Sequence, residues 1–187
     1  ITAAVESLMR IKEPNSSPNL SEQTLVDCSD YDCGGGDFDA FNYVQTKGLA
    51  NRTDYPYYAT NRSCRVTDAM AKQKVVSWAF IGSENSNPTT EQIKTAIMQY
   101  GPVSVDVAVA GNFSAYSSGV YNSCYFGSIN HMVSIEGWND ADGGYWIMRN
   151  SWGADWGEGG YMRIRYTDSR GRKCNQIGST TAFAILN

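Results

Sequence analysis

Apolar residues near the start of the chain recur at the spacing of a helix. Ile1, Ala4, Val5, Leu8 and Ile11 fall on one helical face, which predicts a helix over residues 1–12. No Ser, Thr, Asp or Asn cap precedes this apolar stripe. A helical turn is expected to start at Ser21, and a further helix is expected over residues 38–47 and to end at Gly48, after which tyrosine-rich loops follow. This part of the chain is therefore predicted to be helical.

The pattern changes in the second part of the chain. Thr89 and Gln92 form a capping-box pair, which predicts a helix that runs to Tyr100 and ends at Gly101-Pro102. Apolar and polar residues then alternate, as in antiparallel strands, over residues 103–109, 132–138, 145–148 and 161–166. We predict an α+β chain with a helical unit over residues 1–84 and a β-rich unit over residues 85–187.

Composition removes several classes of protein. A net charge of −4 with scattered Lys and Arg argues against nucleic-acid binding, and we interpret the basic run Arg170–Lys173 as a solvated loop. No run approaches the roughly 20 apolar residues of a membrane helix, so no membrane partner is expected. A single histidine and the lack of a CxxC pair argue against a metal site, and no cofactor is expected.

Two polar tracts carry the candidate chemistry. His131 precedes an apolar-alternating run and is expected to begin a buried strand. Asn150-Ser151-Trp152-Gly153 continues into a run dense in Trp and Gly over residues 156–164. A lone histidine is more often an ordinary hydrogen-bonded residue, but this combination favours a proton shuttle.

These tracts, with Asn130 directly before His131, and four further stretches resemble the papain family of cysteine peptidases, of the papain and cathepsin L-like type. The further stretches are Leu20–Cys28, Cys33–Gly36, Tyr55–Tyr57 and Gly101–Val105. The resemblance implies a two-lobe fold, with a helical N-terminal lobe, an antiparallel β-barrel-like C-terminal lobe and the cleft between them. The terminal segment 181–186 is expected to pack back across the lobes. The implied activity is endopeptidase cleavage in which His131 shuttles the proton and Asn150 orients the His131 ring. Trp152 would shield the hydrogen bond between His131 and Asn150 from water.

The nucleophile of this family is expected upstream of Ile1. The family motif, Cys-Gly-Ser/Ala-Cys-Trp/Tyr, precedes the histidine and asparagine by roughly 130–150 residues, and residues 1–187 do not contain it. Residues 1–187 alone are therefore expected to be inactive. The alternative is a catalytically inactive homologue or fragment that binds peptides.

The resemblance also implies disulfides and substrate contacts. Cys28 would pair with Cys64 and Cys124 with Cys174, whereas the partner of Cys33 would lie in the upstream motif. Residues implied to contact substrate are Gly35, Gly36, Phe38, Asp106, Asn130, Met132, Trp152 and Ser179. Asp106 is unusual because relatives have a small apolar residue there; it either favours Arg or Lys in the substrate or is a solvent-facing or ion-paired Asp. Gly34–Gly36 could form a tight turn that needs positive φ, the resemblance implies that the bare backbone of Gly36 pairs with a substrate strand, and the two explanations are compatible.

Partners and location follow from the same resemblance. We expect protein or peptide substrates, cystatin-like inhibitors and the protein's own pro-segment as partners of a monomer made as a zymogen. Five cysteines suit an oxidising compartment, and the expected location is secreted or lysosomal/vacuolar. Asn-x-Ser/Thr sites suit a glycoprotein but also arise by chance; they lie at Asn15, Asn19, Asn51, Asn61 and Asn112.

Overall fold

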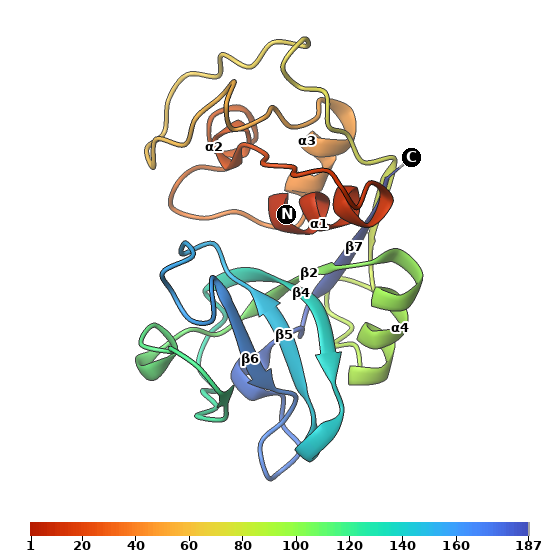
Figure 1. Ribbon diagram of the computed structural model, residues 1–187, viewed down its shortest axis with the longest axis vertical. Coiled ribbons are helices and arrows are strands. Elements are labelled where there is room, and N and C mark those ends of the chain that lie inside the picture. Colours follow the sequence, from red (N-terminus) through yellow and green to blue (C-terminus); the bar gives the residue numbers. More distant parts are fainter. Residues whose placement is uncertain (187) are drawn as a thin grey trace. The chain divides into compact units, whose positions relative to one another are not determined.

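The computed structural model describes residues 1–186, which fold into two compact units (Figure 1). Unit 1 contains residues 1–78 and the end of the chain from Ala184, and unit 2 contains residues 79–183. The division differs from the predicted boundary after residue 84. It differs because two strands, β1 (Ser77–Phe80) and β7 (Thr181–Ile185), each begin in one unit and end in the other.

Unit 1 contains three helices, α1 (Thr2–Lys12), α2 (Glu22–Cys28) and α3 (Ala40–Thr46). As predicted, α1 has no side-chain cap, and the Ser21 hydroxyl caps α2 by accepting from the Thr24 backbone N–H. The apolar stripe of α1 is buried at Ala4, Val5 and Leu8. Ile11 belongs to the same stripe but lies in the last turn, leads into exposed residues 12–15, and is 61% exposed.

Unit 2 begins its regular structure with α4 (Thr90–Tyr100), which has the predicted capping box. The Thr89 hydroxyl accepts from the Gln92 N–H, and the Gln92 side chain accepts from the Thr89 N–H. Its C-terminal Gly101 has φ 88°, a conformation that favours glycine. The next strand is β2 (Val103–Val107), so the helix and strand follow each other directly as the sequence indicated.

The strands form one seven-stranded sheet in the order β1-β7-β2-β4-β5-β6-β3. The remaining strands are β3 (Val120–Tyr121), β4 (His131–Asn139), β5 (Tyr145–Arg149) and β6 (Tyr161–Arg165). β2 pairs antiparallel with β4 and β7, as β5 does with β4 and β6. β3 pairs parallel with β6, and neither β1 nor β3 was predicted from alternation.

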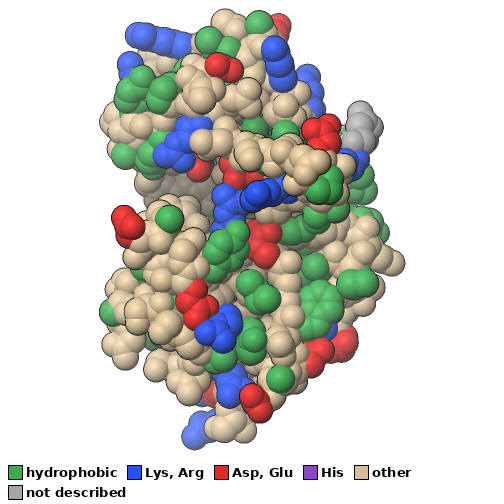
Figure 2. Space-filling view, in the orientation of Figure 1, with side chains coloured by type: hydrophobic (Ala, Val, Ile, Leu, Met, Phe, Trp, Pro, Cys, Tyr) green, Lys and Arg blue, Asp and Glu red, His purple; other side chains and the backbone are tan. Residues whose placement is uncertain are grey.

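The core of unit 2 lies around β2, β4, β5 and β6, where Val105, Ile135, Trp146 and Ile164 are almost fully buried. β2 is buried along its whole length, and both α4 and the segment Cys174–Gln176 contact it. At the surface, the face drawn in Figure 2 carries acidic and basic side chains interspersed among apolar and uncharged ones. Among the described residues, no helix has the length and apolar character needed to cross a membrane.

Candidate active site

The β4–β5 hairpin brings His131 and Asn150 together. The two strands are antiparallel, so the start of β4 lies beside the end of β5. His131 is the first residue of β4, and Asn150 directly follows β5. Their side chains meet with 2.8 Å between His131 Nε2 and Asn150 Oδ1.

The contacts of Asn150 determine where the imidazole carries its hydrogen. The Ser151 backbone N–H also donates to Asn150 Oδ1, at 2.8 Å, and a backbone N–H can only donate. The atom facing both groups is therefore the amide oxygen, so His131 Nε2 must be the protonated nitrogen. Nδ1 is left as the nitrogen that can take up or release a second proton.

Burial protects this hydrogen bond. Asn150 is 8% exposed, and its Nδ2 is buried without a hydrogen-bond partner in the described part of the chain. The Trp152 ring stacks on the His131 ring, with 5.2 Å between centroids and 30° between planes. Trp152 itself is 40% exposed, so its indole lies between the imidazole and solvent.

Further aromatic rings hold Trp152. Trp156 meets it edge to face at 5.2 Å between centroids, and Phe113, which is fully buried, does so at 5.9 Å. Trp156 is fixed in turn because its indole N–H donates to the Ser114 carbonyl at 3.0 Å. Sequence reasoning did not identify Phe113 or Trp156 as site residues; the Trp/Gly-dense run was a signal for Trp156, and no signal pointed to Phe113.

Asn130 ties the chain before His131 to the end of β2. Its Oδ1 accepts from the Val109 N–H at 2.8 Å and its Nδ2 donates to the Val109 carbonyl at 3.0 Å. The Asn130 N–H donates to the Val107 carbonyl at 3.3 Å. These bonds give Asn130 an observed role in fixing the backbone beside His131, whereas the resemblance implied contact with substrate.

Three other residues implied to bind substrate lie close together in unit 2. Asp106 and Met132 are directly opposite each other on β2 and β4 and so share a face of the sheet. The Asp106 carboxylate accepts from the Thr180 N–H at 2.9 Å, which places it next to Ser179 in the chain. Asp106 is only 4% exposed. Asp106 therefore lies on the face of β2 that alternation predicted, but that face is covered by other parts of the protein.

The remaining residues implied to bind substrate lie in unit 1. Gly35 and Gly36 are exposed, and a Cβ added at Gly35 would meet nothing within 4 Å. The chain does turn here, since the Gly35 N–H donates to the Asp32 carbonyl at 3.4 Å, but none of Gly34–Gly36 has the positive φ that would require glycine. Phe38 is 4% exposed and belongs mainly to the core of unit 1.

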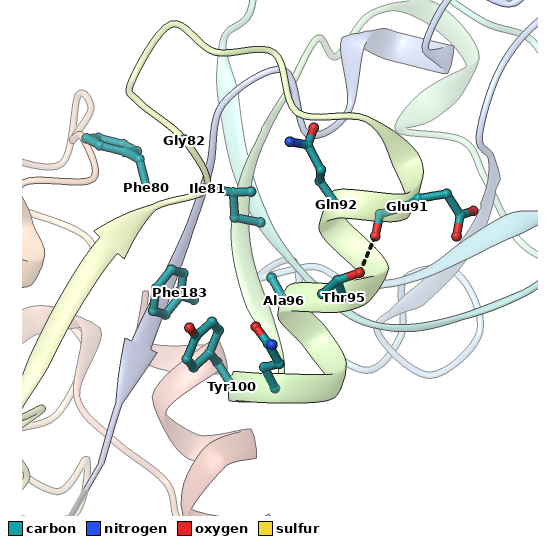
Figure 3. A pocket seen from close by; sticks show the side chains of 10 residues that line it. Phe80, Ile81, Gly82, Glu91, Gln92, Thr95, Ala96, Tyr100 and Phe183 are labelled. Carbon is teal, nitrogen blue, oxygen red and sulfur yellow. Dashed lines mark hydrogen bonds between the residues drawn. The ribbon is translucent and has the colours of Figure 1, made fainter.

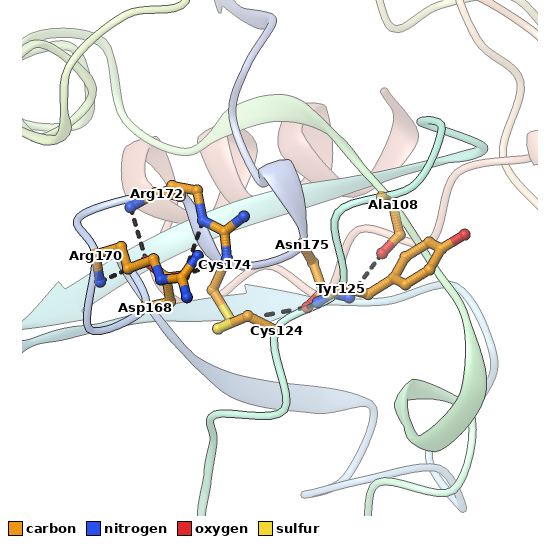
Figure 4. Close-up of a disulfide and its surroundings, with 8 residues drawn as sticks. All are labelled: Ala108, Cys124, Tyr125, Asp168, Arg170, Arg172, Cys174 and Asn175. Atoms are coloured by element: carbon orange, nitrogen blue, oxygen red, sulfur yellow. Dashed lines mark hydrogen bonds and ion pairs between the residues drawn. A yellow bond between two sulfur atoms is a disulfide. The ribbon is translucent and has the colours of Figure 1, made fainter.

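The structure contains the disulfides Cys28–Cys64 and Cys124–Cys174, which is the pairing the resemblance implies. Figure 4 shows Cys124–Cys174. Cys33 is exposed and outside these disulfides, and its N–H donates to Asn61 Oδ1 at 2.9 Å. In the described residues, no group of three or more His, Cys, Asp or Glu is arranged to hold a metal ion.

Two cavities of unit 2 lie apart from His131 and Asn150. One, of about 370 Å³, is open to the surface and lined by α4, residues 80–82 and Phe183, with Tyr100 stacked on Phe183 (Figure 3). The other, of about 610 Å³, is lined by the start of α4 and by residues that include Lys173 and Ser179. Only the second cavity contains a residue implied to bind substrate.

Comparison with known proteins agrees with this geometry. Residues 1–185 match the family model described as papain family cysteine protease. A cathepsin L-like proteinase of Phaedon cochleariae is 37% identical over 175 residues, which cover 89% of this chain and 52% of the relative. The chain spans about half the length of several such curated relatives.

Solved structures give the same result. Bromelain protease from Ananas comosus, in complex with the E64 inhibitor, superposes with a TM-score of 0.85 at 32% identity, covering 100% of this chain and 86% of that one. Digestive procathepsin L2 from Tenebrio molitor gives a TM-score of 0.85 at 30% identity, covering 99% and 59%. By sequence and by fold, the chain belongs to the papain family of cysteine proteases.

Proposed function

We propose that this chain is the part of a cysteine-type endopeptidase that carries the proton shuttle, with its thiolate nucleophile on a segment preceding Ile1. The observation that carries the proposal is the 2.8 Å contact between His131 Nε2 and Asn150 Oδ1 beneath the Trp152 ring. A binding-only protein has no physical need for an imidazole oriented and shielded in this way.

The geometry supports separate roles for Asn150 and His131. Asn150 keeps the hydrogen of His131 on Nε2, so Nδ1 is the nitrogen that exchanges protons with the reacting groups. Nδ1 takes the proton of the cysteine thiol, the thiolate attacks the peptide carbonyl, and the imidazolium returns the proton to the leaving amine. The resulting acyl-thioester is hydrolysed by water, with Nδ1 again accepting a proton and returning it to the thiolate as the thiol re-forms.

Cysteine usage supports an upstream nucleophile. Four of the five cysteines are in disulfides, which leaves Cys33 as the remaining thiol in residues 1–187. Cys33 lies in unit 1 beside the glycine run that we propose to pair with substrate, and a cysteine there is expected to be structural. Residues 1–187 alone are then inactive.

The wider proposal covers partners and location. Exposed backbone at Gly35 and Gly36 suits pairing with an extended protein or peptide substrate, because an open glycine strip leaves room for another strand. Two solved relatives are named as procathepsins, which supports a pro-segment, and a relative solved with the E64 inhibitor supports inhibitor binding. Two disulfides support a secreted or lysosomal/vacuolar location.

The test is to express the intact gene product and treat it with a thiol-directed inhibitor. We expect the modified cysteine, identified by mass spectrometry, to precede Ile1, and a fluorogenic peptide to be hydrolysed. His131→Ala is expected to reduce kcat/KM by at least about 100-fold, the usual contribution of a general acid–base group.

Two matched controls sharpen the result. Cys33→Ser should still be labelled at the upstream cysteine, and the exposed Asp142→Asn should hydrolyse the peptide at the unchanged rate. Labelling at Cys33, or hydrolysis that survives His131→Ala, would contradict the proposal. Failure of the intact product to be labelled or to hydrolyse would favour the peptide-binding homologue.

A further inference from the structure

The segment from Cys174 to Thr180, here called the 174–180 turn, has an unusual backbone. Asn175 and Gln176 have φ values of 52° and 53°, and Gly178 has φ 71°. Left-handed φ is unfavourable for residues other than glycine, and two such residues in succession persist only where surrounding contacts impose them. Asn175 is also fully buried. This turn must therefore be held from outside.

One set of contacts comes from Ala108, the residue that directly follows β2. The Ala108 N–H donates to the Asn175 carbonyl at 2.8 Å, and Asn175 Nδ2 donates to the Ala108 carbonyl at 2.7 Å. Asn175 Oδ1 accepts from the Tyr125 N–H at 3.1 Å, next to the Cys124–Cys174 disulfide (Figure 4). These contacts fix the first half of the turn.

The second half of the turn is held by Asp106. The Asp106 carbonyl accepts from the Gly178 N–H at 3.0 Å, and the Asp106 N–H donates to the Thr180 carbonyl at 3.2 Å. The Asp106 side chain then adds a bond to the Thr180 N–H at 2.9 Å. Ser179 lies between these two attachment points.

Lys173 holds the same half of the turn. Its half-buried side chain donates to the Gly178 carbonyl at 2.6 Å. Burial lowers the pKa of Lys173 to about 8, and the charge of Asp106 acts in the opposite direction. Burial raises the pKa of Asp106, while the bonds from Thr180 and the charge of Lys173 oppose that rise. The two charges stabilise each other inside the protein.

We propose that Asp106 and Lys173 are positioning residues that hold Ser179 in place through the 174–180 turn, and that Asp106 does not itself recognise a basic substrate side chain. The inference rests on the proposed function, because Ser179 is a residue implied to bind substrate. A carboxylate that is 4% exposed and already bonded to Thr180 has little surface left for a substrate. Its position in the sequence suggests a charge selector, but its contacts are those of a structural anchor.

Asp106→Asn separates the two roles. Asparagine keeps an oxygen that can accept from the Thr180 N–H but removes the charge, whereas Asp106→Ala removes both. In the intact enzyme we expect Asp106→Asn to leave the ratio of kcat/KM for Arg and Leu substrates within about twofold of the wild type. Asp106→Ala should raise KM for both substrates about threefold to tenfold with little change in kcat, the ratio that corresponds to one hydrogen bond.

Amide hydrogen exchange provides a readout that needs no activity. In the 187-residue chain, Asp106→Ala and Lys173→Met should each speed exchange of the Gly178 and Thr180 amides, and Asp106→Asn should do so much less. Asp142→Asn is the matched control, because it makes the same chemical change at an exposed site of unit 2. If one variant fails to fold, the others still give the comparison.

The outcomes are distinct. A selective loss of Arg cleavage in Asp106→Asn, by tenfold or more, would overturn the inference in favour of direct recognition of charge. Unchanged exchange at Gly178 and Thr180 in both Asp106→Ala and Lys173→Met would also overturn it. If the wild type cleaves nothing, the proposed function fails, while faster exchange in these variants would still support the anchoring of the turn.

Discussion

Replacing Trp152 with alanine is expected to lower kcat/KM of the intact enzyme about tenfold. The indole stacks on His131 at 5.2 Å between centroids and separates the His131–Asn150 hydrogen bond from water. Without the ring, water competes for Asn150 Oδ1 and for the Nε2 hydrogen. The imidazole then loses part of the restraint that directs Nδ1 toward the reaction.

The magnitude follows from the kind of hydrogen bond that is exposed. When His131 becomes imidazolium, its bond to Asn150 is charge-assisted and is worth about 1.5–3 kcal/mol if shielded, against about 0.5–1.5 kcal/mol for an ordinary one. The difference of about 1–1.5 kcal/mol corresponds to a rate factor of about 5–13. Asn150→Ala, which removes the bond, should cost more than Trp152→Ala.

Nuclear magnetic resonance tests the same reasoning without an active enzyme. His131 is the only histidine in residues 1–187, so its imidazole N–H signal needs no assignment among competitors. We expect that signal to be observable in the wild-type chain and to broaden in Trp152→Ala because solvent exchange becomes faster. Trp152→Phe keeps a ring over the imidazole and is the matched control.

Two results would refute this account. One is a kcat/KM for Trp152→Ala within twofold of the wild type, together with an unchanged N–H exchange rate. The other is an equally large effect of Trp152→Phe, which would show that some property of the indole other than coverage is responsible.

Three further predictions concern stability and pH. Thr89→Ala should lower the free energy of unfolding by about 1 kcal/mol in urea because it removes the cap of α4, with Thr90→Ala as a neighbouring control; equal losses would exclude the cap as the cause. Gly178→Ala should lower the free energy of unfolding by about 2–4 kcal/mol. The new Cβ would lie 2.8 Å from a packed isoleucine methyl, and alanine would have to adopt positive φ. Gly171→Ala has similar φ but open space and should cost about 1–2 kcal/mol; similar losses in a urea titration would contradict the packing argument. The folded pKa of Lys173, about 8, is below its ordinary value of 10.5, so the unfolded chain binds more protons between these values and stability should rise with pH. The Tm of the wild type minus the Tm of Lys173→Met should therefore increase between pH 7 and pH 10. A difference in Tm that stays constant over this range would argue against a buried charged amine.

Local signals predicted much of the fold. The capping box at Thr89 and Gln92 and the glycine at position 101 fixed both ends of α4, because caps act through neighbouring backbone groups. Ile11 is exposed although it belongs to the apolar stripe, because periodicity identifies a helical face but does not reveal how far along the helix packing continues. The parallel pairing of β3 with β6 escaped prediction because two-residue strands carry no alternation.

The site was predictable where residues that are close in space lie on neighbouring strands of the sequence. His131 and Asn150 flank one hairpin, so their proximity follows from antiparallel pairing of neighbouring strands. Phe113 approaches Trp152 only through the tertiary fold, and nothing in its local sequence indicates that contact. The family resemblance supplied the roles of the hairpin residues but not the aromatic support behind them.

Asp106 shows why a correct periodicity can still mislead about function. Alternation along β2 correctly separates Asp106 from Val105 and Val107, but it gives no information about what covers each face. The 174–180 turn covers the Asp106 side, and its shape depends on left-handed Asn175, a conformation imposed by bonds to distant backbone. A charged residue at a position implied to bind substrate is therefore evidence of charge recognition only when its carboxylate remains accessible. Here the carboxylate is bonded to the Thr180 N–H, so the specificity of the site is expected to depend on the position of Ser179 rather than on the charge of Asp106.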